Sequence, residues 1–209
     1  MPSGTSAGER LGVLGGTFDP PHVGHLAVAV DVRHALRLDR VLLVVNNEPW
    51  QKVGTRAITP AEDRFAMVEA AVAGLEGLEA SRLELDAGGP SFTADTLAAL
   101  RTEDPGRELF VILGSDAAAG LPTWERVDEV RRAATIVEVL RPGSPPAPTL
   151  PGWRWERVDG PGLELSSSEL RARLDDGRPL DVLVPAGAVA CIEERGLYGR
   201  RRTTKEPRP

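Results

Sequence analysis

Short aliphatic runs alternate with amphipathic stretches along this chain, and the alternation begins at residue 11. The run over residues 11–15 ends in glycine, and residues 41–45 form a run of five aliphatic residues. Between them, apolar positions near helical spacing over residues 24–38 predict a helix. Continuous aliphatic runs are typical of strands that are buried on both faces. The opening segment therefore predicts a β–α–β unit whose first loop spans residues 15–24.

The same alternation continues to the end of the chain. Further helices are predicted over residues 59–73, 93–100, 123–133, 166–174 and 185–194. Further strands are predicted over residues 78–85, 108–113, 135–140 and 153–158, and the Pro-rich residues 142–151 predict a surface loop. This order favours an α/β fold with a doubly wound parallel sheet covered on both faces. In such sheets, ligands bind beyond the carboxyl ends of the strands, where the strand order reverses.

Length and composition limit the domain organisation. The chain has 209 residues, of which 41% are hydrophobic, enough for one compact domain. We expect that domain to span residues 11–199. Residues 1–10 are expected to form a flexible lead, and residues 200–209 a disordered basic tail.

Charge and cysteine content argue against several classes of protein. The net charge of −6 disfavours nucleic acid as a partner, because DNA and RNA require a basic face. Cys191 is the only cysteine, so no internal disulfide can form, which fits a reducing compartment. No apolar run is long enough to cross a bilayer, and the N-terminal residues contain no apolar signal core. We therefore expect a cytoplasmic protein without a membrane partner, and the oligomeric state, including a homo-oligomer, stays open.

The loop after the first predicted strand suits a phosphate group. Gly15 and Gly16 allow the backbone to turn and to approach a ligand closely. His22 and His25 are three residues apart at the expected helix start, so both imidazoles lie on one face. The helix N-terminus adds free N–H groups and a partial positive charge, and Thr17 adds a hydroxyl. No Ser or Cys adjoins these histidines, so the loop offers no protein nucleophile.

Two alternatives for this loop stay open. One histidine near a helix start is commonly only a capping or surface group. Two histidines together with Asp19 are also the residue types of a zinc site, although no further His or Cys lies nearby.

A second candidate phosphate site lies at residues 165–171. Serines at a helix start cap free N–H groups and also bind phosphate oxygens, and Arg171 lies one turn further on. The alternative is an ordinary capping box formed by Ser166 and Glu169.

The loop sequence Gly-Gly-Thr-Phe-Asp-Pro-Pro-His-Val-Gly-His resembles the signature of the His-x-Gly-His nucleotidyltransferase superfamily. Within it, residues 11–199 resemble bacterial nicotinate-nucleotide adenylyltransferases. The resemblance implies a Rossmann-like nucleotidyltransferase fold. It implies that AMP passes from ATP to nicotinate mononucleotide, giving nicotinate adenine dinucleotide (deamido-NAD) and pyrophosphate in NAD biosynthesis. The attack is in line, with Mg²⁺ as cofactor and without a covalent enzyme intermediate.

Later segments carry the resemblance further, with substitutions. Asn-Asn-Glu-Pro-Trp-Gln-Lys at residues 46–52 resembles a family loop in which proline often stands at Val45. Ser-Phe-Thr-Ala-Asp-Thr-Leu at residues 91–97 has Phe92 in place of the family's tyrosine. Ser-Ser-Ser-Glu-Leu-Arg at residues 166–171 has Ser168 in place of threonine and Leu170 in place of isoleucine.

The resemblance implies a set of functional residues and no residue that binds metal. The catalytic residues implied are His22, His25, Lys52 and Arg171. The ATP-binding residues implied are Gly15, Gly16, Thr17, Phe18, His22, His25, Gly114, Asp116, Ser167, Ser168 and Arg171. The residues implied to bind the mononucleotide are Asn46, Lys52, Ser91, Phe92, Thr93 and Trp124, with the Trp124 ring stacked on the pyridine. Without this context, Lys52 is an ordinary surface lysine and Trp124 a core residue.

Two other functions remain as alternatives. A sister enzyme would use nicotinamide mononucleotide or phosphopantetheine as the acceptor. A non-catalytic nucleotide-binding protein could also be built on the same fold.

Overall fold

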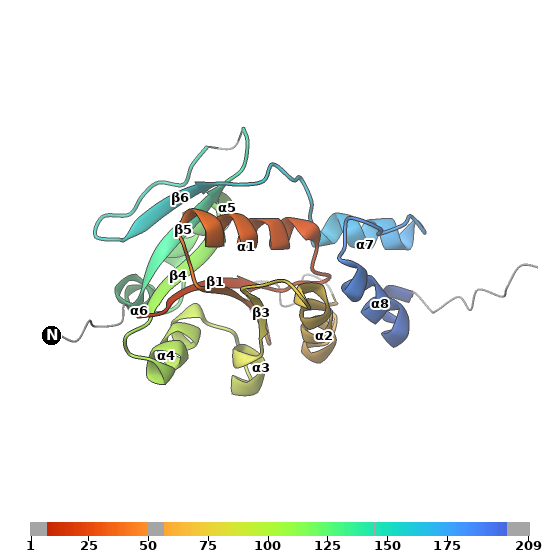
Figure 1. The fold of residues 1–209 in the computed structure, drawn as a ribbon, viewed down its shortest axis with the longest axis horizontal. Helices are drawn as coiled ribbons and strands as arrows, with labels where there is room; N and C mark the ends of the chain where they lie inside the picture. The colour runs from red at the N-terminus through yellow and green to blue at the C-terminus, as the bar shows by residue number, and fades with distance from the viewer. Residues whose placement is uncertain (1–7, 50–56, 144, 200–209) are drawn as a thin grey trace, which may run out of the picture.

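The structure is a computed structural model that describes residues 8–49, 57–143 and 145–199. Its centre is one parallel sheet with helices on both faces (Figure 1). The strands are β1 (Arg10–Gly16), β2 (Arg40–Val45), β3 (Leu78–Ser81), β4 (Glu108–Gly114), β5 (Ala134–Leu140) and β6 (Trp155–Asp159). Their order is β3-β2-β1-β4-β5-β6, and every adjacent pair is parallel. The predicted doubly wound α/β fold is confirmed.

Helices connect the strands from β1 to β5, and two further helices follow β6. They are α1 (Val23–Ala35), α2 (Ala61–Val72), α3 (Leu83–Ala87), α4 (Thr93–Glu103), α5 (Ser115–Ala119), α6 (Val127–Ala133), α7 (Ser167–Asp175) and α8 (Ala186–Arg195). Two short 3-10 helices, η2 (Leu121–Thr123) and η3 (Leu197–Gly199), are also present.

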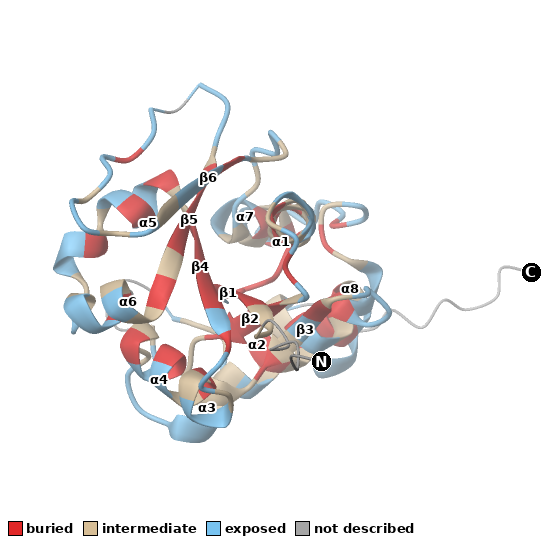
Figure 2. Ribbon diagram, turned by 60° about the vertical axis from the view of Figure 1, so that its left-hand side comes forward, coloured by how far each residue is buried: buried red, intermediate tan, exposed pale blue. Residues whose placement is uncertain are grey.

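The core lies on both faces of the sheet, and the central strands are buried (Figure 2). Side chains alternate between the two faces along each strand. Leu14 and Leu43 pack with α1 and α2 on one face, whereas Val13 and Leu42 pack with α4 and α6 on the other. Burial on both faces explains why these strands are continuous aliphatic runs in the sequence.

The two last helices form a third apolar cluster at the carboxyl end of β1. Leu170 of α7 and Ile192 of α8 pack against Met67 of α2. The backbone N–H of Val23 donates to Leu183 O at 3.0 Å, so this C-terminal part is bonded to the start of α1. The loop after β1 is therefore enclosed between α1 and the C-terminal helices.

Three element predictions differ from the structure. The strand expected over residues 78–85 ends at Ser81, where its pairing with β2 ends, and residues 83–87 form α3. The helix expected from residue 123 begins at Val127, because Arg126 has a φ of +50° in the left-handed region. The short helix α5 was not predicted, since five residues are too few to show a helical period.

Candidate active site

Two adjacent cavities open at the carboxyl ends of β1 and β4, between which the strand order reverses. The larger cavity has a volume of about 860 Å³, and the smaller has a volume of about 290 Å³. Gly16, Thr17 and Leu113 line both of them. The reversal point is where doubly wound sheets bind ligands, and here it holds two neighbouring spaces.

A pair of histidines lines the larger cavity at the start of α1. His22 is the N-cap residue, and its backbone N–H donates to Nδ1 of His25 at 3.1 Å. The two imidazole rings stack with centroids 3.6 Å apart and an angle of 22° between their planes. Gly24 permits this arrangement, because a Cβ at that position would lie 3.0 Å from Nδ1 of His22. The sequence pattern His-x-Gly-His therefore produces one compact pair of rings.

His22 is uncharged at neutral pH. His22 is only 6% exposed, and burial lowers the pKa of its imidazole from 6.5 to about 4. The positive charge of Arg141, which lines the same cavity, lowers this pKa further. A neutral imidazole offers one N–H donor and one acceptor nitrogen.

The N-terminal turn of α7 lies on another side of the larger cavity. Ser166 caps α7 by accepting a hydrogen bond from the backbone N–H of Glu169 at 3.2 Å, as the capping-box alternative predicts for this serine. Ser167 Oγ donates to Pro20 O at 2.8 Å. Arg171 donates to Asp19 O at 2.6 Å and to Ser168 Oγ at 2.9 Å. The two candidate phosphate segments are 147 residues or more apart in sequence at these contacts, yet they are hydrogen-bonded to each other.

The carboxylate of Asp19 is held by the C-terminal part of the chain. Asp19 is 1% exposed, and its Oδ1 accepts a 2.7 Å hydrogen bond from the hydroxyl of Tyr198. Burial raises the pKa of the Tyr198 phenol, and the negative charge of Asp19 acts in the same direction. Asp19 thus joins the loop after β1 to η3.

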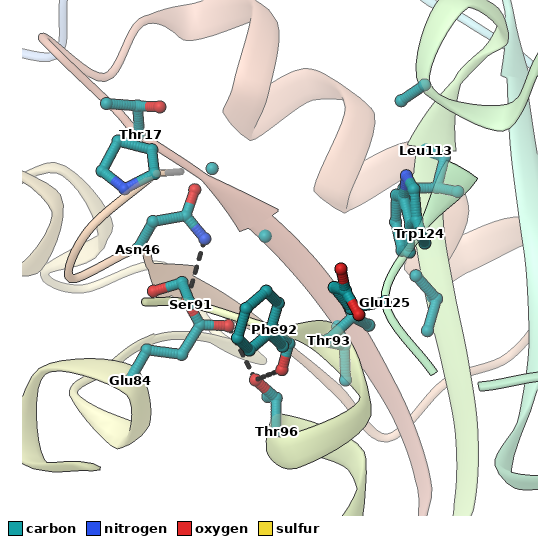
Figure 3. Close-up of a pocket in the computed structure, with 16 residues that line it drawn as sticks. Thr17, Asn46, Glu84, Ser91, Phe92, Thr93, Thr96, Leu113, Trp124 and Glu125 are labelled. Atoms are coloured by element: carbon teal, nitrogen blue, oxygen red, sulfur yellow. Dashed lines mark hydrogen bonds between the residues drawn. The ribbon is translucent and has the colours of Figure 1, made fainter. Parts of the chain in front are cut away.

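The smaller cavity is lined by both polar and aromatic side chains (Figure 3). Trp124 is half-buried beside Leu113, while Phe92 and Thr93 mark the start of α4. Ser91 also lines this cavity, and its Oγ accepts a hydrogen bond from the backbone N–H of Asn47 at 2.8 Å. The cavity thus offers flat rings together with the N-terminus of a helix.

Two carboxylates line the smaller cavity as well. Glu84 accepts hydrogen bonds from Asn46 Nδ2 at 2.9 Å and from Thr96 Oγ1 at 2.7 Å. Glu125 is exposed and follows Trp124 directly. Because Glu84 accepts from the amide nitrogen, it fixes the orientation of the Asn46 side chain.

Comparison with known proteins agrees with this geometry. The sequence profile described as cytidylyltransferase-like matches residues 13–173, which include both histidines and Arg171. The chain belongs to the cytidylyltransferase-like family. The matched part of this cytidylyltransferase-like protein contains β2 to β6 entirely, together with most of β1 and of α7.

Close relatives cover nearly the whole chain. A protein of Roseiflexus sp., named "Probable nicotinate-nucleotide adenylyltransferase", is 46% identical over 197 residues, covering 90% of this chain and 97% of the relative. A protein of Corynebacterium kroppenstedtii with the same name is 44% identical over 192 residues, covering 90% of each chain. The solved structure of Plasmodium falciparum nicotinic acid mononucleotide adenylyltransferase complexed with NaAD shares the fold, with a TM-score of 0.73. Its sequence is 17% identical, and the match covers 91% of this chain and 98% of that one.

Most of the candidate residues named from the sequence line one of the two cavities. The larger cavity is lined by Gly16, Thr17, Phe18, His22, His25, Gly114, Ser167, Ser168 and Arg171. The smaller cavity is lined by Gly15, Gly16, Thr17, Asn46, Ser91, Phe92, Thr93 and Trp124. The cytidylyltransferase-like chain therefore divides its candidate residues between two neighbouring spaces.

One candidate residue is placed differently, and another is not described. Asp116 is not among the described residues that line either cavity; its side chain is 96% exposed and lies 3.9 Å from the guanidinium of Arg141. It points outward because it lies in the first turn of the unpredicted helix α5. Lys52 lies outside the described residues.

Other residues of the site escaped the sequence analysis. Arg141 and Glu84 line the cavities, and Tyr198 and Arg64 bind the backbone or side chains of residues that do so. In the sequence they are isolated charged or aromatic residues without a motif. Their partners lie far along the chain, so only the fold identifies them.

Two features are absent from the described part of the chain. There, no group of three or more His, Cys, Asp and Glu side chains is arranged to hold a metal ion, which does not support the zinc alternative. No helix within the same residues has the length and apolar character needed to cross a membrane.

Proposed function

We propose that this protein transfers AMP from ATP to nicotinate mononucleotide, giving nicotinate adenine dinucleotide and pyrophosphate. The observation that carries the proposal is the pair of adjacent cavities that share Gly16 and Thr17, with both histidines on the side of the larger one. One cavity then holds ATP and the other the mononucleotide. The relatives' names and the Plasmodium falciparum structure complexed with NaAD support the same reaction.

The reaction requires that the two substrates be aligned, and it requires no protein group that reacts covalently. An oxygen of the mononucleotide phosphate attacks the α-phosphorus of ATP, a new P–O bond forms, and the bond from the α-phosphorus to the bridging oxygen breaks. Pyrophosphate leaves with the electrons of that bond, and no enzyme intermediate forms. Catalysis then comes from positioning the two substrates and from stabilising charge on the transferred phosphoryl group.

The larger cavity supplies donors for the phosphate chain. We propose that His22 and His25 bind the ATP phosphates, with His25 nearest the α-phosphate, and that Thr17, Lys52 and Arg171 hold the remaining oxygens. Ser167 and Ser168 begin α7, whose N-terminus carries a partial positive charge that suits an anion.

Mg²⁺ fits this site as a companion of ATP. The imidazoles, hydroxyls and guanidinium of the larger cavity suit phosphate oxygens better than they suit a hard divalent cation, and the carboxylates of Glu164 and Glu169 in its lining belong to exposed residues. The carboxylate of Asp19 is engaged by Tyr198. We therefore propose that Mg²⁺ is held mainly by the ATP phosphates and water, and that it neutralises charge on the departing pyrophosphate.

The smaller cavity accounts for the acceptor. The Trp124 ring would stack on the flat pyridine, and the N-terminus of α4 at Thr93 would meet the nicotinate carboxylate. Glu84 and Glu125 oppose an anionic ring substituent, so the balance between nicotinate and nicotinamide is open to direct measurement.

Pyrophosphate release with ATP and each acceptor tests the proposal. Nicotinate mononucleotide should support the highest kcat/KM, ahead of nicotinamide mononucleotide and phosphopantetheine. The His25→Ala variant should lose about a hundredfold or more in kcat if the imidazole stabilises the transition state. Wild-type protein that binds ATP without releasing pyrophosphate with any of these acceptors would instead support a non-catalytic nucleotide-binding protein.

Trp124→Ala tests the acceptor cavity. Loss of the stacking partner should raise the KM for nicotinate mononucleotide by about tenfold and leave the KM for ATP within about twofold. Trp153→Ala is the matched control, because Trp153 is also half-buried against the same core but lines neither cavity. Equal weakening of both substrates would remove Trp124 from the acceptor site.

A further inference from the structure

A buried arginine of α2 lies behind the wall that the two cavities share. Arg64 is 1% exposed and is among the largest fully buried side chains of the described residues. It does not itself line either cavity. Removing a guanidinium from water is costly unless hydrogen bonds compensate it, so its partners show what the burial achieves.

Arg64 donates to backbone carbonyls of three separate segments. Nε donates to Thr59 O at 2.8 Å, just before α2, and Nη2 donates to Asn47 O at 2.9 Å. Nη1 donates to both Thr17 O at 3.0 Å and Asn46 O at 2.7 Å. A single nitrogen therefore holds the loop after β1 and the loop after β2 at a fixed separation.

The loop after β1 borders both cavities, and the loop after β2 borders the smaller one. Thr17 lines both of them, and Asn46 lines the smaller. The backbone N–H of Asn46 donates to Gly16 O at 3.0 Å, and that of Asn47 donates to Ser91 Oγ at 2.8 Å. With its carbonyls bound by Arg64, the Asn46–Asn47 backbone is fixed on both sides.

No other side chain can replace this arrangement. A planar guanidinium presents its N–H groups as a rigid fork, whereas a lysine ammonium is a compact point charge. An apolar side chain would fill the space but would leave four hydrogen bonds to carbonyls unmade, one of them buried and three part-buried. The residue type therefore matches the task of binding several backbone oxygens at once.

We propose that Arg64 is a positioning residue that sets the placement of one cavity relative to the other and so aligns the attacking phosphate with the α-phosphorus of ATP. This inference rests on the two-substrate reaction proposed above. A misplacement of about 1 Å between reacting groups costs about a hundredfold in rate, so small changes in the shared wall have large effects. Each cavity keeps its own lining when Arg64 changes, so binding of each substrate alone should persist.

The test compares Arg64→Lys and Arg64→Gln with wild type and with a control variant. Arg107→Lys is the matched control: Arg107 is 8% exposed and donates to Leu100 O at 2.9 Å and to Glu9 and Glu103, but it lies at the amino end of β4. For each protein we would measure kcat, both KM values and the thermal midpoint. The Kd of nicotinate mononucleotide alone and the Kd of a non-hydrolysable ATP analogue alone complete the set.

We expect Arg64→Lys to lower kcat by about tenfold to a hundredfold and to change either Kd by less than about threefold. Arg64→Gln should lose more of kcat, and Arg107→Lys should keep the wild-type kcat at a similar loss of thermal midpoint. A kcat within about twofold of wild type in Arg64→Lys would overturn the proposal, as would a parallel loss of kcat in Arg107→Lys. Wild type run in the same assay tests the reaction itself. If wild type releases no pyrophosphate, the proposed function is wrong, whereas an active wild type with an active Arg64→Lys variant refutes only the role of Arg64.

Discussion

Acidification should destabilise the folded protein through His22. The imidazole is buried and neutral, with a pKa lowered from 6.5 to about 4 mainly by burial. Between these two pH values the unfolded chain binds a proton that the folded chain excludes. The contribution is therefore fully present above about pH 6.5 and is lost as the pH falls toward 4. The difference between the two pKa values corresponds to about 3 kcal/mol of unfolding free energy.

Urea unfolding of wild type and His22→Gln over pH 4 to 8 measures this contribution. Carboxylates titrate in both proteins, so only the difference between the two curves reports on His22. That difference should change by about 3 kcal/mol across the range. His34→Gln, which removes an exposed histidine of α1, is the control for the loss of an imidazole.

A direct measurement can refute the reasoning. The chain has three histidines, so each imidazole can be assigned by single substitution and followed by NMR as the pH changes. If the His22 imidazole titrates near 6.5, or if the two urea curves differ by a constant amount, burial does not control its charge. Under the proposed function, a bound ATP analogue should raise this pKa, because phosphate oxygens stabilise the imidazolium.

Three further substitutions test the surrounding structure. Gly24→Ala places a methyl group about 3.0 Å from the ring of His22. Steady-state kcat should fall by about tenfold or more, while the urea midpoint changes little. An unchanged kcat would mean that the position of the ring is unimportant. Tyr198→Phe removes the 2.7 Å hydrogen bond to the buried Asp19 carboxylate. The free energy of unfolding in urea should fall by about 1 to 3 kcal/mol. A decrease under about 0.5 kcal/mol would contradict this prediction. The fully buried carboxylate of Glu138 accepts hydrogen bonds from one backbone N–H, one indole and one guanidinium. Glu138→Gln should therefore lower the free energy of unfolding, measured by heat or urea, by about 3 kcal/mol. A variant as stable as wild type would show that the charge is dispensable.

The sequence predicts the central strands well because burial on both faces leaves a simple pattern. The run over residues 41–45 lies within β2 (Arg40–Val45), and that over residues 135–140 lies within β5 (Ala134–Leu140). The segments predicted wrongly are short. Helices α3 and α5 have five residues each, too few to be stable alone, so neighbouring elements decide their conformation.

The residues of the candidate site differ in the same way: those close together in the sequence could be predicted, and those with distant partners could not. His22, His25 and the glycines before them lie within a few residues of one another, so the sequence indicates their role directly. Arg64 reaches Thr17 across 47 residues, and Tyr198 reaches Asp19 across 179. Such partners follow from the order of the strands, which the hydrophobic pattern does not determine.

The residues that the sequence could not identify share one physical task. Hydrogen bonds from side chains help to fix the backbones of the loops that surround the cavities. Arg64 binds the loops after β1 and β2, Glu84 joins Asn46 to α4, and Tyr198 holds Asp19. Each of these polar side chains is bound to groups that differ in sequence position but meet at one edge of the sheet. Substitutions at these positions should therefore change how the bound substrates are aligned more than they change the residues that contact the substrates.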